Sequence, residues 1–510
     1  MMNSNSYIEN RISKTNTKVS ILKNNKSFYS IYNPQRDVDF FCSNEKFKNS
    51  GFICIAGIGN GYHIKKLSEI YPDKFILAFE LNNDSLDFLF KTNNFEFTKN
   101  KKIKLTTLEN LQNEIINFYN PIIHGNFYFT YIKSWLDFHI DFVNEIENKI
   151  NNAISNISAD ISVQSHFGKI WMHNILENIK FINNNNLQNN FKINISKTAA
   201  IIAAGPSLDE TILKLKKNLN QYFIISTDTA YPSLLENNII PEIVVSIDAQ
   251  IYSREHFIGN KKRFANTIFL LDLCSNSSIT KIINPKNILF FNNGHPFCNF
   301  IEQNTKCNFI KLNSGRGTVT STAWDFAIKC GFKNIEFFGT DFSFYHNKPY
   351  AKSTYLEKQF LNLSCKLMNL ESQYTKLMFR TETITDNKGT LTTKLLNEYK
   401  GSQEQMFKQT NINIFCASEK CNPMNLKLNN KTNNTCINNE ITFVTSTINL
   451  DFLKEYYLKL SQIKSDKETD IIYPILPLLA WGKNKKIDFF SIINLAKKLI
   501  HNYTIRCYEC

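Results

Sequence analysis

The sequence predicts an α/β protein with two Rossmann-like parallel-sheet domains and a helical C-terminal region. Three observations favour this fold class. Short apolar runs alternate with helix-length segments along most of the chain, which is the pattern of buried parallel strands joined by helices. Glycine-containing turns follow several of these runs, and others end in an acidic residue. Both features are typical of the strand ends at which α/β sheets bind ligands.

The composition supports more than one folded domain. The chain has 510 residues, of which 43% are hydrophobic and 13% aromatic, so it can bury several cores and is not disordered. No apolar run reaches the roughly 18 residues of a membrane span, and the N-terminus lacks the apolar segment of a signal peptide. We therefore expect a cytoplasmic protein without a membrane span.

The charge of the chain is basic but dispersed. Lysine and arginine number 59 against 45 aspartate and glutamate residues, which gives a formal charge of +14. Nearly all of the basic residues are lysines, spread along the chain without an arm or a stripe. Because nucleic-acid binders concentrate basic side chains on one face or segment, we expect no nucleic-acid partner.

The twelve cysteines predict no metal site. Most lie singly, and several fall inside predicted strands or helices, where a free cysteine packs as a small apolar residue. Cys507 and Cys510 form a CxxC at the end of the chain. A zinc site needs a second pair of ligands, and none accompanies this one.

The first Rossmann-like domain is expected over residues 1–150, after a loose polar lead-in at 1–27. Its predicted elements are a strand at 51–56, a glycine-rich loop at 57–61, a helix at 62–70 and a strand at 75–79. Glu80 follows the second strand, and this order is half of a Rossmann fold. The loop and Glu80 would suit the ribose of a nucleotide or of S-adenosylmethionine, but such turns also occur in folds that bind nothing.

A helical connector is expected over 151–195, because Trp171, Ile175 and Ile179 recur at a spacing of four. The central domain follows over 196–436, and residues 437–510 form a mainly helical C-terminal domain. The predicted central strands lie at 198–204, 222–226, 243–247, 268–271, 288–291, 308–312, 335–338 and 412–415, and the helices between them include 209–219, 318–330 and a helix around 355–378. This alternation predicts a parallel sheet.

The strongest candidate site is the turn Gly205-Pro206-Ser207-Leu208 between a strand and a helix. Glycine permits a close backbone approach, and proline suits the first helical turn because it lacks an N–H group. Free amides and the positive end of the helix would together form an anion site for a phosphate. An ordinary capped turn is the alternative interpretation.

A second turn of this kind is Ser314-Gly315-Arg316-Gly317-Thr318, which again follows a strand and begins a helix. Arg316 is one of the few arginines of the chain, and its planar guanidinium suits a phosphate or a carboxylate. A surface arginine in a loop is the alternative. We expect the two turns, opened by Gly205 and Ser314, to converge on a single nucleotide phosphate.

Three acidic residues follow predicted strands. They are Asp228, Asp248 and Asp341, the last in Gly339-Thr340-Asp341. Carboxylates repel a phosphate unless they face sugar hydroxyls, base amino groups or a metal. A nucleotide therefore fits this edge of the sheet better than a bare phosphate, and the sequence leaves open whether Mg²⁺ accompanies it. Mg²⁺ is the one cofactor that this pattern leaves open, and the nucleotide interpretation needs no metal ligand.

The candidate catalytic residues follow Asp341 along the chain. Tyr345 and Tyr350 could donate to a leaving phosphate without a change of charge. His346 lies between them, and Glu382 lies in the loop after the helix around 355–378. Either Glu382 or His346 could act as general base for an acceptor hydroxyl, and a solvated side chain is the alternative for each.

These residues together resemble the Maf (motility-associated factor) family of flagellin glycosyltransferases over roughly residues 28–480. The ordered set carries the resemblance, rather than any single motif. The matching stretches are Ser30–Asp37, Trp171 with Asn174 and Asn178, Ala204–Leu208, Asp228, Pro241–Asp248, Gly317–Gly331 and Gly339–Asp341.

The central part is also similar to the bacterial sialyltransferases that use CMP-activated sugars. In that family a Gly-Pro-Ser-Leu turn holds the nucleotide, a Ser-Gly loop precedes a long helix, and a Gly-x-Asp strand end leads into two tyrosines that contact the phosphate. The residues that match in this order are Gly205–Leu208, Ser314-Gly315, Gly339–Asp341, Tyr345 and Tyr350. Asp228 stands where the sialyltransferases tend to have asparagine, and no histidine matches their catalytic one.

The resemblance implies transfer of a nonulosonic acid of the pseudaminic, legionaminic or sialic type from a CMP-sugar to Ser/Thr of flagellin, in support of flagellum assembly and motility. A CMP-activated nonulosonic acid and flagellin would be the partners. One alternative is a 6-hydroxymethylpterin pyrophosphokinase-like enzyme that uses ATP and Mg²⁺, with Asp228 and Asp248 as metal ligands. Others are a non-catalytic flagellin-binding protein and a methyltransferase that uses the loop at 57–61.

Overall fold

The computed structural model describes most of the chain, which forms two compact units. The described residues are 5–185, 190–259, 266–305, 307–313, 317–385, 389–408, 410–418, 427–428, 440–444, 448–466 and 468–504. The first unit comprises Met1–His166, Lys464–Thr469 and Leu479–Lys486, and the second comprises Phe167–Ile463, Asp470–Leu478 and Ile487–Cys510. The four-part division expected above stays a prediction. In the described ranges, no helix is long and apolar enough to cross a membrane.

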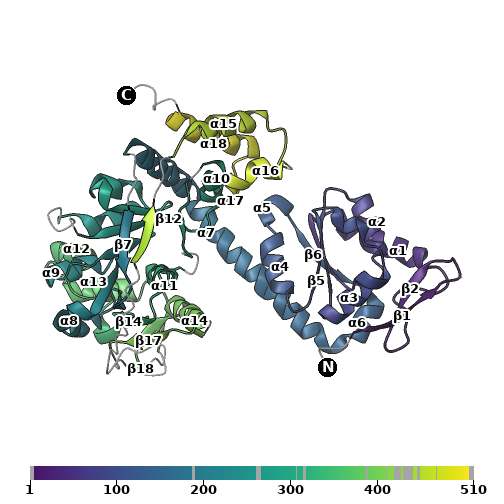
Figure 1. Ribbon diagram of the computed structural model, residues 1–510, viewed down its shortest axis with the longest axis horizontal. Coiled ribbons are helices and arrows are strands. Elements are labelled where there is room, and N and C mark those ends of the chain that lie inside the picture. The colour runs from purple at the N-terminus through teal and green to yellow at the C-terminus, as the bar shows by residue number, and fades with distance from the viewer. Residues whose placement is uncertain are drawn as a thin grey trace. The chain divides into compact units, whose positions relative to one another are not determined.

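A four-stranded parallel sheet forms the centre of the first unit (Figure 1). Its strands lie in the order β5-β4-β3-β6, with bounds β3 (Phe52–Ala56), β4 (Phe75–Glu80), β5 (Ile103–Thr107) and β6 (Phe127–Tyr131). The helices of the unit include α1 (Pro34–Cys42), α2 (Tyr62–Ile70), α3 (Asn83–Thr92), α4 (Leu111–Phe118), α5 (Pro121–His124) and α6 (Lys133–Phe138). The chain order reverses between β3 and β6, which makes this the topological switch point of the sheet.

The residues before this sheet form a hairpin, so the expectation of a loose lead-in at 1–27 is wrong. β1 (Tyr7–Ile12) pairs antiparallel with β2 (Lys18–Leu22). Most side chains of β1 are exposed or half-exposed, which explains why the segment has the composition of a tail. Tyr7 is nevertheless fully buried in the core of the unit, and it anchors the hairpin there.

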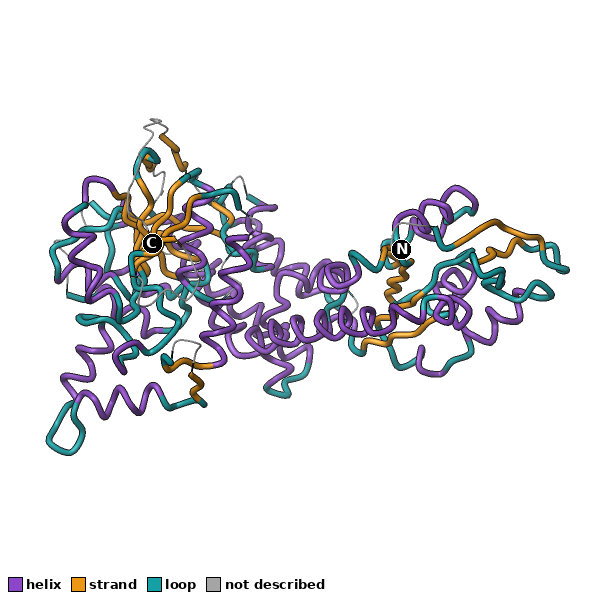
Figure 2. The backbone as a smooth tube through the Cα atoms, turned by 90° about the horizontal axis from the view of Figure 1, so that it is seen from below, coloured by secondary structure: helices purple, strands orange, loops and turns teal. Residues whose placement is uncertain are grey.

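A nine-stranded sheet forms the centre of the second unit, and its strands lie side by side among helices in Figure 2. The strand order is β13-β12-β11-β10-β9-β8-β14-β17-β18, and every pairing is parallel. The chain adds strands outward from β8 and then returns to place β14 on its other side, so the switch point lies between β8 and β14. The bounds are β8 (Thr198–Ile202), β9 (Tyr222–Thr227), β10 (Ile243–Ser246), β11 (Ile268–Asp272), β12 (Ile288–Asn292), β13 (Ile310–Lys311), β14 (Asn334–Phe338), β17 (Asn413–Cys416) and β18 (Lys427–Leu428).

Helices cover both faces of this sheet, because successive side chains of a strand point to opposite faces. Ala199 of β8 packs in one core cluster with Trp324 of α11 (Val319–Lys329). Ala200, the next residue, packs in another cluster with Ile212 of α8 (Leu208–Lys217). The protein is thus α/β with two Rossmann-like parallel sheets, as the sequence predicts.

One continuous helix, α7 (Val143–Asn184), covers most of the expected connector (Figure 1). Two of its asparagines are buried and hold the loop that follows β11. The side-chain amide of Asn178 donates to the carbonyls of Leu273 and Ser275, at 2.9 and 3.0 Å, and that of Asn174 donates to two further carbonyls. These bonds give a structural role to two residues of the resemblance.

The helix expected around 355–378 is two helices. Asn369 caps the second of them, since its side chain accepts a hydrogen bond from the amide of Ser372 at 2.9 Å, and an asparagine in this position begins a new helix. The remaining elements are α9 (Tyr231–Glu236), α10 (Pro296–Asn304), α12 (Tyr355–Leu363), α13 (Leu370–Met378), α14 (Lys394–Lys408), α15 (Asp451–Gln462), α16 (Thr469–Ile472), α17 (Leu476–Asn484), α18 (Phe489–Thr504) and the antiparallel pairs β15 (Thr383–Thr385) with β16 (Leu391–Thr393) and β7 (Asn190–Asn194) with β19 (Glu440–Val444).

Candidate functional site

A cavity of about 740 Å³ opens at the switch point of the second unit. It lies at the carboxyl ends of β8, β9 and β14, where ligands of open α/β sheets bind, and its size is that of a small-molecule site. Hydroxyl side chains are common in its lining. The lining includes Gly205, Thr227, Thr229, Thr318, Thr320, Gly339, Thr340, Asp341, Ser343, Tyr350, Arg380, Thr381, Glu382, Thr393, Lys394 and Tyr399.

Gly205 allows the turns after β8 and β14 to meet. Its amide donates to the carbonyl of Gly339 at 2.8 Å. A Cβ atom on Gly205 would lie 2.4 Å from that carbonyl oxygen and 2.6 Å from Oδ2 of Asp341. The close approach that the sequence assigns to a phosphate is therefore made by the protein's own backbone and by a carboxylate.

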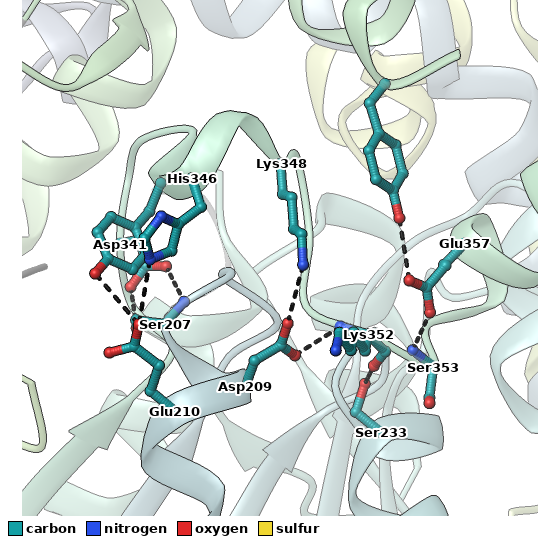
Figure 3. A network of polar contacts seen from close by, with 12 residues as sticks. Ser207, Asp209, Glu210, Ser233, Asp341, His346, Lys348, Lys352, Ser353 and Glu357 are labelled. Atoms are coloured by element: carbon teal, nitrogen blue, oxygen red, sulfur yellow. Dashed lines mark hydrogen bonds and ion pairs between the residues drawn. The ribbon is translucent and has the colours of Figure 1, made fainter. Parts of the chain in front are cut away.

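Asp341 reaches into the turn at Ser207 (Figure 3). Its Oδ2 accepts a hydrogen bond from the Ser207 amide at 2.7 Å, and its Oδ1 accepts one from the Ser207 hydroxyl. Burial raises the pKa of Asp341 to about 6, against the two Ser207 hydrogen bonds that lower it, and the nearby Asp209 and Glu210 raise it further. The carboxyl group thus titrates well above the range of a free aspartate.

These contacts correct the expectation of free amides in the Gly205–Leu208 turn. The amide of Ser207 binds Asp341, that of Leu208 binds the carbonyl of Gly205, and Pro206 has none to offer. Because the first turn of α8 also carries Asp209 and Glu210, this helix end presents negative charge. A phosphate in the cavity would need its cations from other elements.

The segment that follows Asp341 is fastened to the start of α8 (Figure 3). Asp209 accepts from the amide of Lys352 at 2.8 Å and pairs with the ammonium of Lys348 at 3.6 Å. Glu210 accepts from the Tyr345 hydroxyl at 3.3 Å and contacts the His346 ring at 3.2 Å. Tyr345 and His346 are outside the lining of the cavity, so their assigned roles stay predictions.

Tyr350 lines the cavity and is the predicted phosphate donor of this segment that does so. Burial raises its pKa, the Arg380 guanidinium acts to lower it, and Asp228 acts to raise it. Its hydroxyl therefore keeps its proton at neutral pH and can donate a hydrogen bond. Arg380 is close enough to act on Tyr350 and lies two residues after the end of α13, and within the described chain its guanidinium has no carboxylate partner.

Arg380 and Lys394 are the functional candidates that sequence reasoning missed. Both line the cavity together with Glu382 and Glu398, and they supply the positive charge that the turn at Gly205 lacks. Arg380 is one of only about seven arginines in the chain. The scarcity of arginine in this chain, which makes Arg316 a candidate, applies equally to Arg380. This scarcity is the sequence signal that could have identified Arg380.

The turn opened by Ser314 is only partly described. Ser314, Gly315 and Arg316 lie outside the described residues. Thr318 lines the cavity with Gly205, and its side chain caps α11 by accepting from the amide of Ser321 at 3.1 Å. The start of α11 and the end of β8 therefore face one cavity, while the expected convergence on a phosphate stays a prediction.

Asp228 and Asp248 lie beside the cavity but not in its lining. Oδ1 of Asp228 accepts from the amide of Thr229 at 2.7 Å, and Oδ2 accepts from the hydroxyl of Ser246 at 2.7 Å. Asp248 accepts from the amide of Gln250 at 2.9 Å. Burial and the charge of Asp228 raise the pKa of Asp248. Each carboxylate keeps further lone pairs after these bonds, and the role of the two aspartates toward a magnesium ion stays a prediction.

A group of metal-ligand type lies elsewhere in the second unit. Among the residues that the structure describes, Cys274, His295 and Cys298 are buried with one ligand atom each within 4.8 Å of the others. Nδ1 of His295 accepts from the amide of Phe297 at 3.1 Å, which leaves the ring proton on Nε2 and no lone pair there for a metal. The group fits a packed thiol pair better than a metal centre.

The glycine-rich loop of the first unit is filled by the protein itself. Oε1 of the fully buried Glu80 accepts from the hydroxyl of Tyr7 at 2.6 Å and from the amides of Ile58 and Gly59 at 2.8 and 3.2 Å. Its Oε2 accepts from the indole of Trp135 at 2.7 Å. The acid and the amides that would bind a ribose or phosphate are thus used within the unit.

Comparison with known proteins places this fold. A family model described as 6-hydroxymethylpterin diphosphokinase MptE-like matches residues 169–347. A solved structure of a MAf glycosyltransferase from Magnetospirillum magneticum AMB-1 is similar over 99% of this chain and 87% of that chain, with a TM-score of 0.50 and 11% sequence identity. At this identity the likeness establishes the fold alone. It is the fold that the resemblance to the Maf family implies.

Two uncharacterized proteins of Treponema pallidum (strain Nichols) are similar in sequence. One is 39% identical over 142 residues, which are 28% of this chain and 66% of the relative. The other is 31% identical over 205 residues, which are 38% of this chain and 71% of the relative. The chain thus spans about two thirds of the length of each.

Proposed function

We propose that this chain is a glycosyltransferase. The chain belongs to the same family as the Treponema pallidum protein that it matches at 31% identity, and it has the fold of a MAf glycosyltransferase. The proposed reaction moves a nonulosonic acid from a CMP-sugar to Ser/Thr of flagellin. The observation that carries the proposal is the cavity at the switch point, which joins hydroxyl side chains to Arg380, Lys394 and Glu382.

The lining of the cavity suits a sugar nucleotide with a single phosphate. Threonine and serine hydroxyls can bind sugar and ribose hydroxyls, and Arg380 can bind a phosphate or the carboxylate of an acidic sugar with two parallel hydrogen bonds. Tyr350, which keeps its proton, can donate to the leaving phosphate. One phosphate carries little enough charge for these groups to stabilise it without a metal.

The transfer step balances with the residues at hand. The acceptor hydroxyl oxygen forms a bond to the anomeric carbon, and the bond between that carbon and the phosphate oxygen breaks, so that CMP leaves with the electron pair. The hydroxyl proton goes to a general base. Glu382 lines the cavity and is the better placed of the two predicted bases, whereas His346 contacts Glu210.

The experiment that tests this proposal measures sugar transfer to flagellin. The protein is incubated with CMP-pseudaminic acid and flagellin, and flagellin is weighed by mass spectrometry. We expect a mass gain of one sugar residue, a loss of at least about tenfold in rate for Arg380→Ala from a lost charged hydrogen bond, and an unchanged rate for Arg11→Ala, whose side chain pairs with Glu9 on the first unit. No gain with any CMP-nonulosonate would contradict the proposal.

A second candidate is favoured by the family model at 169–347, which is described as a pterin diphosphokinase. Such an enzyme would bind ATP with Mg²⁺ near Asp228 and Asp248. Thermal unfolding in the presence of CMP or of ATP with Mg²⁺ separates the two, since a ligand stabilises the state that binds it. We expect CMP to raise the Tm and ATP with Mg²⁺ to leave it unchanged.

A further inference from the structure

A second cavity, of about 400 Å³, lies wholly within the first unit. Its lining includes Gly51, Lys74, Lys102 and Asn126, which stand directly before or at the starts of the four parallel strands. The cavity is therefore at the amino ends of the strands, the edge opposite the glycine-rich loop. Ligands of open α/β sheets usually bind at the carboxyl ends of the strands, so the sequence does not predict a site at this edge.

Four lysines from separate segments converge on this cavity: Lys48, Lys74, Lys102 and Lys483. Three of the ammonium groups are held by backbone carbonyls. Lys74 Nζ donates to Lys48 at 3.0 Å, Lys102 Nζ to Pro72 at 3.1 Å and Lys483 Nζ to Ile122 at 2.8 Å. Each ammonium has three donors, so each keeps donors for a ligand after its carbonyl is bound.

The positive charge of this cavity is balanced only in part. Among the described residues, only two carboxylates, Asp73 and Asp466, line it beside the four lysines. In the described ranges, none of the four ammonium groups lies within 4 Å of a carboxylate oxygen. Burial lowers the pKa of His124, another lining residue, to about 4, so its ring is neutral near pH 7.

Partial burial also lowers the pKa of Lys483, which Asp466 acts to raise. Placing four like charges around one concavity costs free energy through repulsion. A bound anion would remove that cost. Lysine is common on this chain, but these four differ from dispersed surface lysines because they meet in one cavity and three of them are held by carbonyls.

We propose that this cavity binds a compact, phosphate-bearing polyanion through Lys48, Lys74, Lys102 and Lys483. Ammonium groups that approach from several directions suit a phosphate group, which lysine binds as a point charge. The volume is that of a small ligand, which excludes a duplex. The proposal does not rest on the function proposed for the second unit.

The experiment titrates inorganic pyrophosphate into the full-length protein by calorimetry. The site variant is Lys102→Gln with Lys483→Gln, because glutamine still donates to a carbonyl but carries no charge. The matched control is Lys65→Gln with Lys91→Gln, which removes two exposed charges from α2 and α3 of the same unit. Far-UV circular dichroism checks that all three proteins are folded.

We expect saturable binding with a Kd that rises about tenfold in the site variant, as for the loss of two partly exposed charge contacts, and that is unchanged in the control. Higher salt should weaken binding to the wild type more than to the site variant. A second arm uses phosphatidylglycerol vesicles, with phosphatidylcholine as reference.

Vesicle binding that the site variant loses would assign the phosphate to a lipid headgroup, and pyrophosphate binding alone would assign it to a free phosphate compound. Absence of saturable binding in both arms, or an equal loss in the control, would overturn the proposal. Sugar transfer is not a readout, so failure of the glycosyltransferase proposal would leave this result unaffected.

Discussion

At the scale of single residues, Asp341 decides the chemistry of the turn after β8. Its carboxylate binds the backbone and hydroxyl of Ser207, 134 residues away in the chain. The sequence places both residues at strand ends on one edge of a sheet, which is correct. It cannot tell that the carboxylate takes the amide expected to bind a phosphate, because that depends on a contact between distant segments.

The titration of Asp341 predicts a pH dependence of stability. Its pKa is about 6 in the folded protein against 3.8 without the fold, so the folded protein binds more protons in this window and the Asp341 contribution to stability falls as pH rises through it. Asp341→Asn keeps an oxygen for the Ser207 amide and does not titrate. We expect the stability of the wild type relative to Asp341→Asn to fall by roughly 2–3 kcal/mol between pH 4 and pH 7.

Urea unfolding of the two proteins at both pH values measures this difference, and the titrating groups that do not interact with Asp341 cancel in the comparison. Equal pH dependence in the two proteins would contradict it.

Gly205 gives a second prediction at this scale. Because a Cβ atom would meet the Gly339 carbonyl at 2.4 Å, Gly205→Ala forces two backbones apart and should cost at least about 2 kcal/mol. Gly401 lies in α14, and a Cβ atom added to it would have nothing within 4 Å, so Gly401→Ala should stabilise by about 0.5–1 kcal/mol. Denaturant unfolding measures both, and a neutral Gly205→Ala would show that the turn can open.

At the scale of elements, the sequence predicts those helices and strands whose own residues carry the signal, without help from distant segments. The helix at 62–70 and the strand following it are found where expected, since the loop, helix and apolar run each have a local signal. β5 is missed because a lysine and two threonines interrupt its apolar run, and β6 because its side chains are only partly buried. The hairpin of β1 and β2 depends on Tyr7 reaching the core.

The helix α7 provides the prediction for this scale. Asn178 is buried, and its amide satisfies the carbonyls of Leu273 and Ser275. Asn178→Ala leaves both carbonyls without this donor, so we expect a loss of about 2–4 kcal/mol in the free energy of unfolding. Asn152→Ala, at an exposed position of the same helix, should change it by less than about 0.5 kcal/mol. Chemical denaturation of the two variants decides whether the hydrogen bonds of Asn178 stabilise the fold.

At the scale of the whole molecule, the two sheets share a plan and differ at their switch points. The crevice of the second unit contains the 740 Å³ cavity, whereas that of the first is filled by Glu80 and its four donors. Fold class follows from the alternation of strands and helices. Membership of 464–469 and 479–486 in the first unit does not, because it depends on contacts such as that of Lys483 with Ile122, 361 residues apart.

This difference predicts one sugar-nucleotide site per chain. Calorimetric titration with CMP should give a stoichiometry of one. Glu80→Gln presents one oxygen to four donors and leaves at least one unpaired, so it should destabilise the first unit by about 1–3 kcal/mol without changing the Kd for CMP. A stoichiometry of two, or a weakened Kd in Glu80→Gln, would mean that the first unit also binds the nucleotide.

The filled crevice around Glu80 also limits how the first unit can change during evolution. Opening a ligand site there would require Tyr7, Glu80 and Trp135 to be exchanged together with the ring of Phe28 that packs on Gly59. Every single exchange would leave a buried polar group without its partner, or a void, and would cost stability. We therefore expect single substitutions at these positions to weaken the first unit without creating a ligand site at this edge of its sheet.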